Sequence, residues 1–158
     1  MCIRDSFSTG LTFEKAFSLP EMQNSYGVSD VTDSWGEKEN LTVYDNLGDF
    51  FRTGLTSITS VSVNSGNDKL QTYFSYANTT GRGILNENKL SKHNINLRET
   101  AVLFNSRLKL DGNVNVMKQT VKNKPVSGGF YMNPLVGLYR FPRGEDLSYY
   151  KENYERYN

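Results

Sequence analysis

The sequence predicts an all-β fold: a segment of an antiparallel transmembrane β-barrel that carries long external loops. Two observations predict it. Stretches in which apolar and polar residues alternate are separated by short turn sequences, which is the pattern of strands with one apolar face. Short connections also alternate with long ones, as expected when short periplasmic turns and long outer loops lie at opposite ends of a barrel wall.

About five stretches carry the strand pattern. In the clearest one, Leu108, Leu110, Val114 and Val116 share one face, and charged or amide residues occupy the other. In another, Glu99 interrupts an otherwise apolar face. The expected strands cover residues 8–18, 55–64, 70–76, 93–103 and 108–116.

The connections between these strands differ in length. Ser65–Asp68 and Asn105–Ser106 are short turns, whereas Asn78–Ser91 is longer and Leu19–Gly54 and the segment from Val121 onward are much longer. Gly and Asn in the first turn favour positive φ, which tight hairpins require. We therefore expect the two short turns on the periplasmic side and the three longer segments outside.

Composition narrows the functional classes. No apolar run approaches the roughly 20 residues that a membrane-spanning helix needs, and a net charge of +1 gives no basic excess for nucleic acid. The polar faces of the strands are rich in Asn, Ser, Thr and Gln, which suits a water-filled or plugged lumen. A soluble β-sandwich that binds carbohydrate is the alternative.

Chemistry-bearing residues are sparse. His93 is the only histidine and Cys2 the only cysteine, which argues against a three-ligand metal site and against a Ser-His-Asp triad. The acidic clusters at Glu37–Glu39 and Glu145–Asp146 lie in long loops and lack calcium-loop spacing. We therefore expect no enzyme activity and no cofactor or metal.

Several short strings lie in one order along the chain. They include Phe13-Glu14-Lys15, Ser34-Trp35-Gly36, Tyr44-Asp45-Asn46, Tyr131-Met132-Asn133-Pro134-Leu135 and Phe141-Pro142-Arg143-Gly144. In order and spacing these strings resemble SusC/RagA-type TonB-linked outer-membrane proteins, and the resemblance covers nearly the whole chain. It implies an importer of glycans or peptides located in the outer membrane.

The resemblance also implies architecture and partners. Transporters of this class have 22-stranded barrels with a plugged lumen, so residues 7–158 are expected to form part of such a TonB-dependent receptor barrel, with the plug absent. Residues 1–6 are expected to be an arbitrary or artefactual start. The implied partners are a SusD/RagB-like surface lipoprotein lid, the TonB complex, an oligosaccharide or peptide substrate and outer-membrane lipid, with no nucleic acid.

The candidate substrate-binding residues lie in the long loops. They are Trp35, Tyr131, Tyr139, Arg140 and Arg143. Aromatic rings stack on sugar faces, and the arginine fork binds carboxylates or carbonyls through two hydrogen bonds. The alternative is structural: these side chains anchor the loops or form the aromatic girdle of a barrel.

The two fold hypotheses differ in how this chain behaves when it is expressed alone. A barrel wall is expected to be insoluble without detergent, because an isolated sheet has two open edges and an apolar face. A β-sandwich is expected to be a soluble monomer that unfolds cooperatively. Sedimentation of the expressed chain with and without detergent checks this, and a soluble, folded monomer would contradict the barrel hypothesis.

Overall fold

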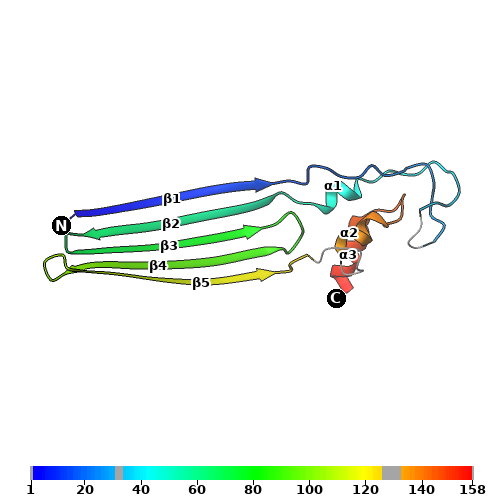
Figure 1. The fold of residues 1–158 in the computed structure, drawn as a ribbon. Helices are drawn as coiled ribbons and strands as arrows, with labels where there is room; N and C mark the ends of the chain where they lie inside the picture. The colour runs from blue at the N-terminus through cyan, green and yellow to red at the C-terminus, as the bar shows by residue number, and fades with distance from the viewer. Residues whose placement is uncertain (1, 31–33, 126–132, 158) are drawn as a thin grey trace. The chain divides into compact units, whose positions relative to one another are not determined.

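The computed structural model describes residues 2–30, 34–125 and 133–157 (Figure 1). Its contacts divide the chain into two compact units. The sheet unit comprises Met1–Glu14, Thr53–Gly83 and Glu87–Asn123. The loop unit comprises Lys15–Arg52, Ile84–Asn86 and Lys124–Asn158.

The sheet unit is a single antiparallel sheet whose five strands lie side by side in chain order (Figure 1). The strands are β1 (Cys2–Glu14), β2 (Gly54–Gly66), β3 (Leu70–Arg82), β4 (Lys89–Leu103) and β5 (Leu108–Lys122). Each strand pairs with the next one along the chain. The prediction of a mostly antiparallel β fold is confirmed.

Several predicted strand boundaries are wrong. The first strand ends at Glu14, not at residue 18, and residues Cys2–Ser6 pair with β2 in register. The predicted long connection Asn78–Ser91 is also too long, since β3 continues to Arg82 and β4 begins at Lys89. Polar residues continue these strands because the ladder is held by backbone hydrogen bonds, which do not depend on an apolar face.

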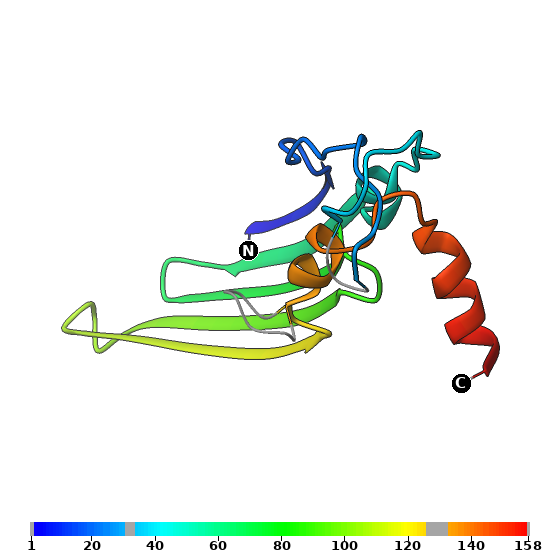
Figure 2. The ribbon, with the colours of Figure 1, turned by 90° about the vertical axis from the view of Figure 1, so that its right-hand side faces the viewer.

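The hairpin turns lie at one end of the sheet and the β3–β4 connection at the other (Figure 2). In the β2–β3 turn, the Asn67 carboxamide oxygen accepts hydrogen bonds from the backbone N–H groups of Lys69 (2.8 Å) and Leu70 (2.9 Å). In the β4–β5 turn, Phe104 and Asn105 both have a φ of 52°. The short turns therefore share one end, as their alternation in the sequence predicts.

Register separates an apolar face from a polar face. One cross-strand row consists of Phe7, Val61, Tyr76, Ile95 and Val116, and the next consists of Asp5, Val63, Phe74, Leu97 and Val114. We call the side that carries these rows the apolar face. Glu99, predicted to interrupt it, does lie on this face, where it accepts a hydrogen bond of 2.7 Å from the hydroxyl of Thr72.

The apolar face is exposed within this chain. Val114 and Val116 are 59% and 58% exposed. Among the described residues, the buried apolar side chains are Leu47 and Leu138, and both belong to the loop unit. The sheet thus has no covering layer of its own in the described part of the chain, and a further surface has to cover its apolar side.

The loop unit contains three helices that the sequence analysis did not predict. They are α1 (Asn46–Phe50), α2 (Pro134–Tyr139) and α3 (Leu147–Tyr157). Asp45 caps α1 by accepting a hydrogen bond from the Gly48 N–H (2.9 Å), and Asn133 caps α2 ahead of Pro134. No helix among the described residues is long and apolar enough to span a bilayer.

The Asn67 turn makes a testable contribution to stability. Asn67→Ala removes the acceptor of two backbone N–H groups and is expected to lower the free energy of unfolding by about 1 kcal/mol. Asp68→Ala is the matched control, because Asp68 lies in the same turn and forms no side-chain hydrogen bond there. Urea unfolding followed by circular dichroism measures both variants, and equal losses would contradict the assigned role of Asn67.

Candidate functional site

Among the described residues of the loop unit, two polar side chains are buried. Asn46 is 5% exposed and Arg143 is 8% exposed. Polar groups are costly to bury unless they are hydrogen-bonded. Their burial therefore marks the places where the loop unit is organised around polar contacts.

Asn46 joins two segments that are distant in the sequence. Its side-chain nitrogen donates a hydrogen bond to the Glu145 carbonyl oxygen (2.8 Å), and its side-chain oxygen accepts one from the Leu147 N–H (2.9 Å). Asn46 is the first residue of α1 and Leu147 is the first residue of α3. One carboxamide thus satisfies both a donor and an acceptor of the backbone where the last helix begins.

Arg143 lies beside this junction and lines a cavity of about 400 Å³. Its backbone N–H donates to the Ser34 hydroxyl (3.2 Å), and its Nη2 donates to the Phe141 carbonyl oxygen (2.7 Å). Burial lowers the pKa of the guanidinium from its ordinary value, yet arginine stays protonated at neutral pH. Among the residues that the structure describes, no carboxylate forms an ion pair with it.

The rest of the cavity wall mixes apolar and polar groups. The lining residues besides Arg143 are Leu19, Pro20, Met22, Asn24, Val43, Tyr44, Asp45 and Leu47. The guanidinium, the phenol, the amide and the Asp45 carboxylate on this wall provide oriented hydrogen bonds to a small polar group. Carbonyl, hydroxyl or carboxylate oxygens of a sugar or a peptide have the chemistry that this wall accepts.

Trp35 lies in the loop unit where residues 23–30 and 34–39 are joined by backbone hydrogen bonds. These run from the Gly27 N–H to the Glu37 carbonyl oxygen (2.9 Å) and from the Gly36 N–H to the Gly27 carbonyl oxygen (3.0 Å). Trp35 is 67% exposed, and its ring centroid lies 5.6 Å from that of Tyr26. An exposed pair of aromatic rings of this kind suits stacking on a sugar face.

The structure separates the predicted site residues. Arg143 contacts Ser34, the residue before Trp35, through the hydrogen bond from its backbone N–H. Tyr139 is exposed at the end of α2, and Arg140 is the C-cap of that helix. Neither Tyr139 nor Arg140 lines the Arg143 cavity. Tyr131 lies outside the described residues.

The sequence analysis missed three residues of this region. Asn46 was not singled out, although an Asp-Asn pair ahead of Leu47 is a helix N-terminus signal. Tyr44 and Asn24, which line the cavity, carry no such signal. Their approach to Arg143 depends on the folding of segments that are about a hundred residues apart.

The polar face of the sheet offers a second hollow, of about 470 Å³. Tyr73 lies in it beside Arg98 and Asp111, which are joined by two hydrogen bonds, one of them 2.9 Å long from Nε to Oδ1. The remaining wall is mostly amide and hydroxyl: Asn64, Gln71, Asn96, Thr100, Lys109 and Asn113. Among the described residues, no group of three or more His, Cys, Asp or Glu side chains is placed to hold a metal ion.

No protein-family model matches the chain, and no curated protein matches it. Function is therefore inferred from the two units themselves.

The junction at Asn46 makes a testable prediction. Asn46→Leu leaves the Leu147 N–H and the Glu145 carbonyl without their partner, so local stability is expected to fall by about 2 kcal/mol. Hydrogen exchange and limited proteolysis of residues 145–157 measure the loss. Asn40→Leu is the control, since Asn40 is exposed in the same unit and forms no side-chain hydrogen bond. Unchanged protection in Asn46→Leu would contradict the role of the junction.

Proposed function

We propose that this chain forms part of the wall and the external loops of a SusC/RagA-type, TonB-dependent importer of glycans or peptides in the outer membrane. The observation that carries the proposal is the exposed apolar face shared by five consecutive antiparallel strands. Soluble monomers rarely leave such a continuous apolar surface open to water. In a barrel wall, lipid would cover the apolar face and the water of the lumen would solvate the polar face.

Strand length supports a membrane wall. The strands contain 13 to 15 residues each, whereas strands of soluble proteins usually contain about 3–10. A tilted strand needs about 9–11 residues to cross the hydrocarbon core. Strands of this length cross the core and extend beyond it, as barrel strands do when they lead into external loops.

The large apolar residues of the apolar face form a band whose position along the strands shifts between β2 and β3. Its outermost large apolar residues are Ile3 and Phe13 in β1, Leu55 and Val63 in β2, Leu70 and Tyr76 in β3, Ile95 and Leu103 in β4, and Leu108 and Val116 in β5. The band is centred on residue 8 in β1 and on residue 112 in β5. Through the register, residue 112 aligns with residue 3 of β1.

The proposal assigns a role to each part of the chain. The apolar face contacts lipid, and the amide-rich hollow around Tyr73 faces the lumen. The loop unit contributes to the outer mouth, where the Arg143 cavity and the Tyr26–Trp35 ring pair contact substrate. A SusD/RagB-like lipoprotein lid and the TonB complex are the proposed partners, and the mechanism is gated passage without catalysis.

A soluble carbohydrate-binding β-sandwich is the second candidate. The exposed ring pair of Tyr26 and Trp35 favours it, because sugar-binding modules use exposed aromatic rings. A second sheet would then have to cover the apolar face. The strand lengths of 13 to 15 residues do not follow from this architecture, so the importer accounts for more of the observations.

Cysteine labelling in intact cells tests the proposed orientation. With a membrane-impermeant maleimide, Asn86→Cys in the β3–β4 connection is expected to react, whereas Asp68→Cys in the β2–β3 turn is expected to react only after the outer membrane is permeabilised. The reverse pattern would contradict the orientation, and a soluble protein labelled at both positions would favour the sandwich. Uptake of labelled oligosaccharides and peptides by the same cells, with and without a protonophore, separates energy-coupled import from diffusion.

A further inference from the structure

Two polar rows lie beyond the apolar band of β3, β4 and β5, at the end of the sheet away from the short turns. The first is a row of hydroxyls formed by Ser57, Thr80, Ser91 and Thr120, which are successive cross-strand partners from β2 to β5. The second lies two residues further on and consists of Arg82, Lys89 and Lys122, again direct partners. Both rows lie on the apolar face.

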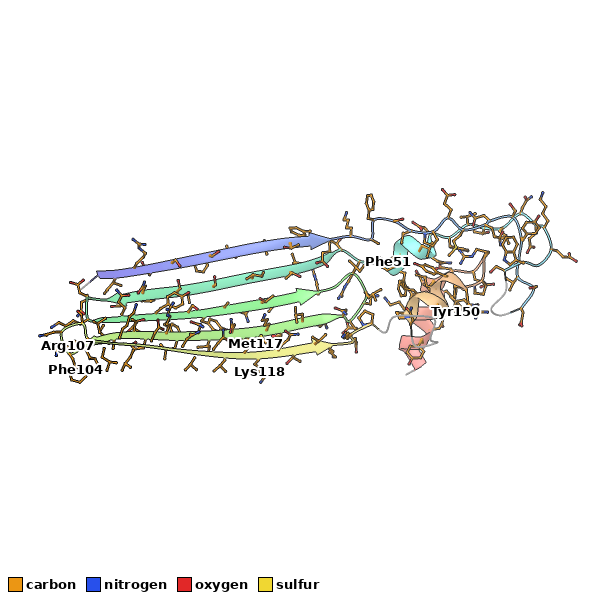
Figure 3. The ribbon with its side chains drawn as sticks, in the orientation of Figure 1. Phe51, Phe104, Arg107, Met117, Lys118 and Tyr150 are labelled. Carbon is orange, nitrogen blue, oxygen red and sulfur yellow. The ribbon has the colours of Figure 1, made fainter. Side chains whose placement is uncertain are left out.

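The two rows border a single hollow of about 520 Å³. All seven of these side chains line it, together with Leu55 and Leu90. Another cation stands nearer to the apolar band, since Lys118 is the partner of His93 in the row between Thr120 and Val116. Figure 3 labels Lys118 beside Met117 on β5, and the register assigns these neighbours to opposite faces.

The cationic row is incompletely neutralised. Like charges that are directly opposite each other on neighbouring strands repel, and the register makes Lys89 the neighbour of both Arg82 and Lys122. Lys89 forms an exposed ion pair of 2.9 Å with Glu87. Among the described residues, Arg82 and Lys122 have no ion-pair partner. One carboxylate therefore faces three cations, and a bound anion would relieve the remaining repulsion.

The surface of the hollow is mostly apolar, and the polar groups of the two bordering rows match a phosphate group. Guanidinium and ammonium groups form charge-assisted hydrogen bonds to phosphate oxygens, and serine and threonine hydroxyls add neutral donors. The apolar band begins four residues below the hydroxyl row on the same face, at Tyr76, Ile95 and Val116. A ligand that fills the hollow therefore lies next to a surface suited to hydrocarbon.

We propose that this hollow binds the phosphate-bearing headgroup of a membrane lipid whose acyl chains lie along the adjoining apolar face. The inference rests on the proposed function, which places that face in lipid. Lysine and arginine side chains at such a boundary lay their stems over apolar surface and hold their charges among the headgroups. The site thus fixes the height of β3, β4 and β5 in the leaflet and recruits a specific anionic lipid.

Lipid binding to the purified protein in neutral detergent tests the proposal. The probe is diphosphoryl lipid A, with its dephosphorylated form as the matched ligand. The triple variant Arg82→Gln/Lys89→Gln/Lys122→Gln is expected to bind the phosphorylated probe about 100-fold more weakly, from about a fivefold loss per cation. The control variant Lys69→Gln/Lys92→Gln/Arg107→Gln removes the same charge from two turns and the polar face and is expected to change affinity by less than threefold.

Three results would overturn the proposal: equal binding of both lipid forms, equal losses in both triple variants, or inorganic phosphate that competes as strongly as the lipid. A nitroxide label at Val114→Cys reports whether the apolar face lies in lipid. It therefore separates failure of the headgroup site from failure of the proposed function. If the label is accessible to oxygen but not to a water-soluble nickel complex, the apolar face lies in lipid, and weak lipid A binding overturns the headgroup site alone. If the label is accessible to the nickel complex in vesicles, the membrane-wall proposal itself fails.

Discussion

Backbone pairing between neighbouring strands fixes which side chains share a face, and every feature of the sheet follows from that register. A slip of one residue would exchange the two faces of a strand. Val114 and Val116 would then lie among amides, and Asn113 and Asn115 would lie among aliphatic side chains. The row of Phe7, Val61, Tyr76, Ile95 and Val116 crosses all five strands only in the observed register, so the apolar face and the register depend on each other.

Glu99 shows how the apolar face tolerates a charge. It lies among aliphatic side chains, and its cross-strand partner Thr72 donates a hydrogen bond to it. On β5 its partner is Gly112, where an added Cβ would meet nothing within 4 Å. The carboxylate is therefore satisfied from one side and has open space on the other, which lets a polar residue stay on this face without breaking the register.

The sheet could be predicted from the sequence because the alternation of apolar and polar residues is a local pattern. Alternation over nine residues assigns Leu108 to Val116 to a strand without reference to any other part of the chain. Strand ends were less predictable, since from Asn78 to Arg82 polar residues continue the ladder with no change in composition that marks an end. The loop unit was the least predictable, because its organisation depends on contacts such as that of Asn46 with Leu147, which no local pattern encodes.

The same distinction explains why Arg143 was found and its surroundings were not. A short string ending in arginine and glycine is visible in the sequence, whereas the cavity beside it is built by Leu19, Asn24 and Tyr44 from a different part of the chain. Gly144, with a φ of 84°, takes a left-handed conformation that side chains disfavour, and a Cβ there would approach Leu41 to 3.1 Å. The glycine after Arg143 is thus required by the backbone at this bend and by its close packing on Leu41. That requirement gives the string a structural role that does not depend on any ligand of the neighbouring cavity.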